Sequence, residues 1–128
     1  MKTPNTAVEM SLGDIIDRLT ILSRKIFYGE EGAYQEHTYL TEGISKLGIK
    51  LSGALLAAII SLNSMNIEIW NLENEIRNDT EDRMTNEEVG RRAKVIRDYN
   101  KKRIEYKNEI NRLTEKGFRE FKIRHRSQ

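Results

Sequence analysis

Polar side chains stand on the two longest helical patterns of this chain at positions where apolar residues are expected. The set comprises Asn66, Trp70, Glu73 and Arg77, followed later in the chain by Asn100 and Arg103. An ionised side chain on a core-facing stripe is costly unless another group pairs with it. These residues therefore indicate either a structural lock between helices or a working site.

The chemistry that these side chains offer is recognition of an anionic small molecule. Arg77 and Arg103 could hold a phosphorylated sugar or a nucleotide through charge-assisted hydrogen bonds, and the asparagines could orient it. Two other interpretations stay open. Buried Glu–Arg pairs and Asn side chains commonly fix helix register without any ligand, and Glu73 or Asp17 could act as the general base of a small enzyme. We interpret Trp70 as a packing residue in preference to a platform on which a ligand ring stacks.

The N-terminal part of the chain supplies the acids that could complete this polar interior. Ser11 and Asp14 fit a capping box that begins an amphipathic helix over 12–28. Asp14 pairs in sequence with Arg18 at i, i+4, and Asp17 lies on the neighbouring face. This face is either a solvated surface or a cover over the polar interior. A weaker pattern, interrupted by glycines, predicts a short helix near 33–47.

Two long helices carry the polar set itself. An apolar stripe predicts one helix from about Leu51 to Asn78, and a capping box at Thr85 begins a second that could reach Lys116. A polar turn joins them, so they should form a long antiparallel hairpin with the N-terminal helices packed across it. The prediction is an all-α fold, a four-helix bundle built on this hairpin.

The register of the hairpin decides which polar residues can meet. A turn near 79–85 predicts that facing residue numbers sum to roughly 164. Glu73 then faces Arg92 rather than Arg103. Arg103 therefore has to be satisfied by Asp14 or Asp17, or by a ligand. The complete candidate site is Asp14, Asp17, Asn66, Trp70, Glu73, Arg77, Asn100 and Arg103.

Size and composition limit the class of protein. The 128 residues fit a single domain, with 1–10 expected as a loose lead-in and 118–128 as a basic tail. The absence of cysteine excludes disulfides and thiolate metal sites. The N-terminus lacks an apolar signal core, and the longest unbroken apolar run is far shorter than the roughly 18 residues that cross a bilayer. A cytoplasmic protein without membrane contact is expected.

Charge and histidine content bear on partners and cofactors. Residues 1–90 contain 8 Lys and Arg against 15 Asp and Glu, whereas residues 91–128 contain 14 against 5. Such a dipolar chain can pair with a copy of itself, and a homo-oligomer is predicted. The basic tail could also contact nucleic-acid phosphates, an interpretation that is not favoured. His37 and His125 have no neighbours at metal-ligand or nucleophile–base spacing, so neither a metal nor another cofactor is expected.

Three sequence blocks together resemble a known group of proteins. Residues 13–22 fit the pattern G-x-x-x-D-[KR]-L-[ST]-I-L, residues 66–77 fit N-x-x-x-W-x-x-E-x-x-x-R, and residues 100–103 fit N-x-x-R. The combination resembles a family of uncharacterised, all-helical bacterial proteins that carry only a domain-of-unknown-function label. The resemblance covers about 12–113, and Asn74 departs from the acidic residue common there. It implies a helical bundle and, for some members, an association with glycan or lipopolysaccharide biosynthesis, but no established activity or catalytic residue.

Overall fold

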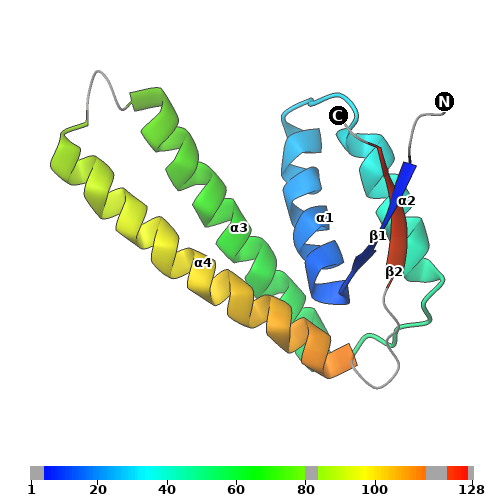
Figure 1. Cartoon of the computed structure of the whole chain (residues 1–128). Helices are drawn as coiled ribbons and strands as arrows, with labels where there is room; N and C mark the ends of the chain where they lie inside the picture. Colours follow the sequence, from blue (N-terminus) through cyan, green and yellow to red (C-terminus); the bar gives the residue numbers. More distant parts are fainter. Residues whose placement is uncertain (1–4, 80–83, 115–120, 127–128) are drawn as a thin grey trace.

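The four predicted helices are present in the structure, a computed structural model that describes residues 5–79, 84–114 and 121–126. The order of elements is β1 Asn5–Met10, α1 Leu12–Phe27, α2 Ala33–Ser45, α3 Gly53–Asp79, α4 Asn86–Thr114 and β2 Phe121–Arg126. Helices α3 and α4 form a long antiparallel hairpin, and α1 packs against both of them and against α2 (Figure 1). The predicted all-α class and the four-helix bundle on a long hairpin are confirmed.

The helix starts follow from side-chain caps that the sequence already contains. Ser11 Oγ accepts a hydrogen bond from the Asp14 amide at 3.2 Å, and Thr85 Oγ1 accepts one from the Glu88 amide at 3.1 Å. These caps satisfy backbone donors that have no partner inside the first helical turn. Both capping boxes therefore begin helices where the sequence predicts them.

Helix α1 is buried on two sides and so connects the two halves of the core. Leu12 and Ile16 pack with Leu62 and Ile110 of the hairpin. The second cluster lies between α1 and α2 and contains Ile15, Leu22, Ala33 and Leu40. An amphipathic helix with apolar residues on two faces can bury both only between two other elements.

The start of α1 comes very close to the last turns of α4. The Gly13 amide donates a hydrogen bond of 2.7 Å to Asn111 Oδ1. A Cβ atom at Gly13 would lie 2.5 Å from the Lys107 carbonyl oxygen. Only glycine allows the two backbones to approach this closely, and the contact fixes where α1 begins against the hairpin.

The ends of the chain differ from the sequence prediction. Within the expected loose lead-in 1–10, Asn5–Met10 forms strand β1, and within the basic tail 118–128, Phe121–Arg126 forms β2. The strands pair antiparallel, from Asn5 opposite Arg126 to Met10 opposite Phe121. Their partners are distant in sequence, so a local pattern carries little signal for this pairing. Residues 1–4, 115–120 and 127–128 lie outside the described part of the chain.

Helix α3 is long and apolar enough, by length and composition, to cross a membrane over Gly53–Arg77. The sequence prediction considered only an unbroken apolar run, whereas the average over a longer window includes scattered polar residues and meets the criterion. Core helices commonly meet it too, and α3 supplies Leu55, Ala58 and Leu62 to the core. Only 28% of its apolar window is buried, so much of the apolar surface of α3 lies outside that core.

Candidate functional site

The centre of the candidate site is an ion pair between α1 and α4. Arg103 Nε donates to Asp17 Oδ1 at 2.8 Å, and Arg103 Nη2 donates to Asp17 Oδ2 at 2.6 Å. The Asp17 side chain is 8% exposed and that of Arg103 is 27% exposed. Two parallel N–H···O bonds fix both position and orientation of a guanidinium group. The sequence left Arg103 to an acid of the first helix or to a ligand, and the structure pairs it with that acid.

Side chains from α3 and α4 complete the network around this pair. Asn66 Nδ2 donates to Asp17 Oδ1 at 2.8 Å and lies 2.7 Å from Thr20 Oγ1, and Thr20 Oγ1 donates to the Asp17 carbonyl at 2.7 Å. Arg103 Nη1 donates to Asn100 Oδ1 at 3.2 Å. Both carboxylate oxygens of Asp17 are therefore occupied, and the network joins three helices at one point.

The electrostatics of the pair follow from this geometry. Burial raises the pKa of Asp17, but hydrogen bonds from Arg103 and Asn66, with the charges of Arg103 and Lys107, outweigh it and lower that pKa overall. The hydrogen bond to Asp17 raises the pKa of Arg103 despite its partial burial. A carboxylate whose pKa is lowered by its hydrogen-bond partners is a poor general base, because those partners favour its ionised form over the protonated one.

The other charged residues of α1 were expected to pair with each other, but they pair with residues of neighbouring helices. Asp14 and Arg18 do not form the i, i+4 pair: Asp14 Oδ1 lies 2.8 Å from Lys107 Nζ of α4. Arg18 makes a bidentate contact with Glu36 of α2 at 2.8 and 2.9 Å. A partner on a packed neighbour holds a long side chain better than a flexible i, i+4 contact. Of this face only Asp17 enters the polar interior, whereas Arg18 turns to α2 and the Asp14 side chain stays half exposed.

The expected pair of Glu73 with Arg92 is wrong. Arg92 pairs with Glu75, and Glu73 is exposed, although its charge reaches Arg103 and helps to raise the pKa of that residue. A shift of two residues turns a helical side chain by about 200°. Register arithmetic alone therefore cannot say which of two nearby acids faces the partner helix. Arg77, also exposed, hydrogen-bonds Asn74 on its own helix.

Trp70 packs against an aromatic residue that the sequence did not single out. Its ring stacks on Tyr28 with centroids 5.9 Å apart and planes 9° from parallel. Trp70 Nε1 is buried and has no hydrogen-bond partner among the described residues. The contact ties the end of α1 to the middle of α3, which agrees with the interpretation of Trp70 as a packing residue.

Of the contact residues that the sequence prediction missed, Thr20 has a local sequence signal, and three others do not. Thr20 lies one turn after Asp17 on the same helix, a spacing at which a hydroxyl commonly bonds a backbone carbonyl. Tyr28, Glu36 and Asn111 are separated from their partners by long stretches of chain, and no local spacing identifies them. The candidate set is thus divided in space: Asp17, Asn66, Asn100 and Arg103 lie together, whereas Glu73 and Arg77 face solvent.

The structure also brings a serine to His37, which the sequence did not predict. Ser23 Oγ lies 3.4 Å from His37 Nε2 across the α1–α2 contact, in an exposed position. A nucleophile and its base normally lie within about 2.6–3.2 Å. The contact is therefore looser than a catalytic dyad. Among the described residues no group of three His, Asp or Glu side chains could hold a metal ion.

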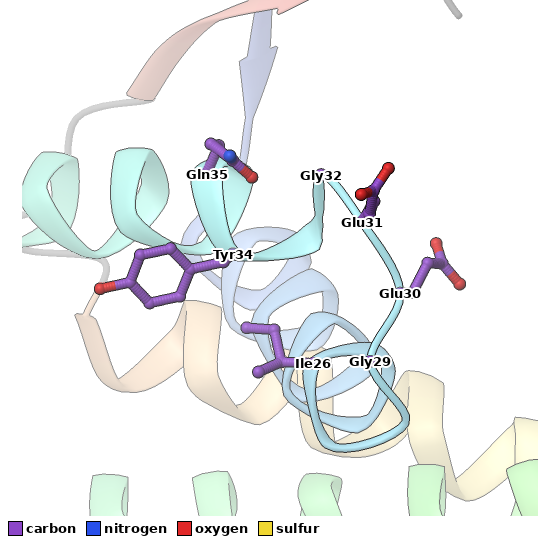
Figure 2. A pocket seen from close by; sticks show the side chains of 7 residues that line it. All are labelled: Ile26, Gly29, Glu30, Glu31, Gly32, Tyr34 and Gln35. Carbon is purple, nitrogen blue, oxygen red and sulfur yellow. The ribbon is translucent and has the colours of Figure 1, made fainter.

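A cavity of about 560 Å³ opens at the turn between α1 and α2, away from the Asp17 network (Figure 2). The Tyr34 ring and Ile26 lie on one side of it, and Glu30 and Glu31 point away from them. None of the predicted site residues contributes. The remaining lining residues are Gly29, Gly32 and Gln35.

Comparison with known proteins gives no match. No protein-family model matches the chain, and neither a curated protein nor a solved structure matches it. The resemblance of the three sequence blocks to a helical bacterial family therefore stays a prediction, as do the homo-oligomer, the cytoplasmic location and the anionic ligand. Function has to be argued from the geometry alone.

Proposed function

We propose that this protein is a non-catalytic interaction module, in which the Asp17 network holds the α3–α4 hairpin at a fixed position against α1. The observation that carries the proposal is the bidentate pair between Asp17 and Arg103. It consumes the one arginine of the candidate site that points into the bundle. An anion at Arg103 would lie beside a carboxylate that Arg103 and Asn66 already hold, and the two negative charges would repel each other.

The position of the network supports a role in fixing how the three helices sit against one another. Asp17, Asn66 and Arg103 come from three different helices, and their hydrogen bonds are directional. Apolar packing alone allows helices to slide, because it depends little on direction. A single well-paired polar group among helices can specify one register at some cost in stability. The geometry favours this role over anion binding.

The energetic test compares a single variant with a double variant. Arg103→Leu should lower the free energy of unfolding by about 3 kcal/mol, because it leaves a nearly buried carboxylate unpaired. The double variant Asp17→Leu/Arg103→Leu should recover at least half of that loss. Urea denaturation measures both. Arg112→Leu is the matched control, since Arg112 pairs with Glu109 on the exposed surface of the same helix. This substitution should lower the free energy of unfolding far less than Arg103→Leu.

The functional test is a thermal-shift screen of the wild-type chain with phosphate, pyrophosphate, nucleotides and nucleotide sugars. We expect no increase in Tm with any of them. An increase that depends on ligand concentration and disappears in the double variant would overturn the proposal, because it would show that the network binds an anion. In that case the anion-binding module would be the better description.

A further inference from the structure

One stretch of α3 and the residues just before it carries no charge at all. From Leu51 to Ile67 the chain contains no Asp, Glu, Lys or Arg. One side of this stretch is buried, with Leu55, Ala58 and Leu62 in the core. A surface helix normally places charged residues on its opposite side. The stretch from Leu51 to Ile67 does not.

The outer side of the same stretch is apolar and exposed. Leu56 is 44% exposed and Ile60 is 55% exposed, and the small residues Gly53, Ala57 and Ser64 are also exposed. Their spacing of three and four residues places them on one face of α3, roughly opposite Leu62. We call these five residues the α3 outer face. None of these five residues belongs to the cluster in which α3 packs against α1 and α4.

We infer that the α3 outer face binds a second copy of this chain, with the two α3 helices antiparallel about a two-fold axis near Ile60. This inference rests on the proposed role as an interaction module and names its partner. A two-fold contact has to be self-complementary, because each copy presents the same surface. In this arrangement Ile60 meets Ile60 of the second copy, and Leu56 lies opposite Ser64 of the second copy.

Charge at the ends of the uncharged stretch selects the antiparallel arrangement. Lys50 precedes the stretch and Glu68 follows it, and both are exposed. Antiparallel pairing brings Lys50 of each copy close to Glu68 of the other, so two opposite-charge contacts form. Parallel pairing would place Glu68 beside Glu68 of the second copy, which is unfavourable. The face and its charged ends are thus complementary to themselves in one direction only.

The size of the contact sets the expected strength. Residues 53–67 extend over roughly 22 Å of helix. A single helix pair of this length buries less than a standard interface of about 800 Å² per partner. We therefore expect a weak dimer whose population rises over the micromolar range and whose rim contacts weaken with salt.

The test is sedimentation velocity of the whole chain over a wide range of concentration. The wild-type mass should rise from 15.0 kDa toward twice that value. Ile60→Arg places a charge in the centre of the face and should keep the chain monomeric. The matched control is Ile104→Arg on α4, since Ile104 is 54% exposed and lies off this face. It should dimerise as the wild type does, and circular dichroism should show equal Tm for both variants.

A charge swap tests the direction of pairing. Lys50→Glu and Glu68→Lys should each weaken dimerisation several-fold, and the double variant should restore it. Failure of the double variant to restore the dimer would overturn the antiparallel arrangement. A wild-type chain that stays monomeric, or one in which Ile104→Arg alone abolishes the dimer, would overturn the inference.

Vesicles of phosphatidylcholine and phosphatidylglycerol test the other occupant, since α3 has the composition of a membrane helix. We expect no co-sedimentation of the wild type. Binding that Ile60→Arg abolishes, with no dimer in solution, would assign the face to lipid instead.

The outcomes are distinguishable from those for the proposed function. A wild-type chain that stays monomeric and shows no ligand-induced shift in Tm removes only this inference. A phosphate-induced shift in Tm removes the proposed function and leaves the dimer untouched.

Discussion

Asp17 is a carboxylate on which burial and hydrogen bonding act in opposite directions. Burial alone would raise its pKa, and the hydrogen bonds from Arg103 and Asn66 lower it below the usual value. Buried acids in other proteins keep their charge in the same way, because hydrogen-bond donors stabilise the ionised carboxylate. At the scale of single residues, the network is therefore a stabilising device only while Asp17 is ionised.

This leads to a prediction about pH. A folded-state pKa below the unfolded value means that Asp17 stabilises the fold above its unfolded pKa, near 3.8, and that this contribution is lost as pH falls through the lower folded value. The difference in unfolding free energy between wild type and Asp17→Asn should be constant from about pH 7 to pH 5 and should shrink below about pH 4. Urea denaturation at a series of pH values measures it.

The same experiment can contradict the claim that the fold lowers the pKa of Asp17. If the difference between the two chains stays constant down to about pH 2, then Asp17 has the same proton affinity in both states. The hydrogen bonds to its carboxylate would then contribute no preference for the ionised form. Such a result would also remove the reason for regarding Asp17 as a poor general base.

Among the elements, the helices were predictable and the strands were not. Capping residues and apolar periodicity are local, and they place the four helices within a few residues of their bounds. The pairing of β1 with β2 joins the two ends of the chain, and only tertiary structure can specify it. The same distinction applies to the site. Asp17 with Arg103 was one of the alternatives, whereas Tyr28 beside Trp70 had no sequence signal.

The contact of α1 with α4 yields a prediction at the scale of elements. Gly13→Ala would place a Cβ atom 2.5 Å from the Lys107 carbonyl oxygen and 3.1 Å from Asn111 Oδ1. The backbone oxygen cannot move without displacing a turn of α4. We expect the variant to lose about 1–3 kcal/mol of unfolding free energy despite the better helix propensity of alanine.

Gly90→Ala is the matched control for this prediction. Gly90 is also a helical glycine, but nothing lies within 4 Å of a Cβ atom built there. Alanine should stabilise α4 at this position by about 0.5–1 kcal/mol. If both variants are stabilised to a similar extent, the close approach at Gly13 does not hold α1 against the hairpin.

At the scale of the whole molecule, the two ends of the hairpin have very different surroundings. Among residues 53–77 of α3 the last buried one is Ile69, and among the described residues of α4 none before Ile110 is buried. The end of the hairpin near the α3–α4 turn extends away from α1 (Figure 1). The pair of Arg92 with Glu75 joins the two helices there. The core residues Leu55, Leu62 and Ile110 lie toward the opposite end, and the Asp17 network meets the hairpin near its middle, at Asn66 and Arg103.

Amide hydrogen exchange should therefore be faster at the turn end of the hairpin than at its other end. Amides in 72–77 and 87–95 should exchange much faster than those in 55–69 and 103–114, because local opening near the turn exposes little apolar surface. Glu75→Gln should accelerate exchange at this end and leave α1 unchanged. Glu109→Gln, which removes an exposed pair within α4 at the other end of the hairpin, is the control. Equal protection along the whole hairpin would mean that a partner covers its free end. That result would call for a second contact surface, because antiparallel pairing through 53–67 leaves residues 72–77 uncovered.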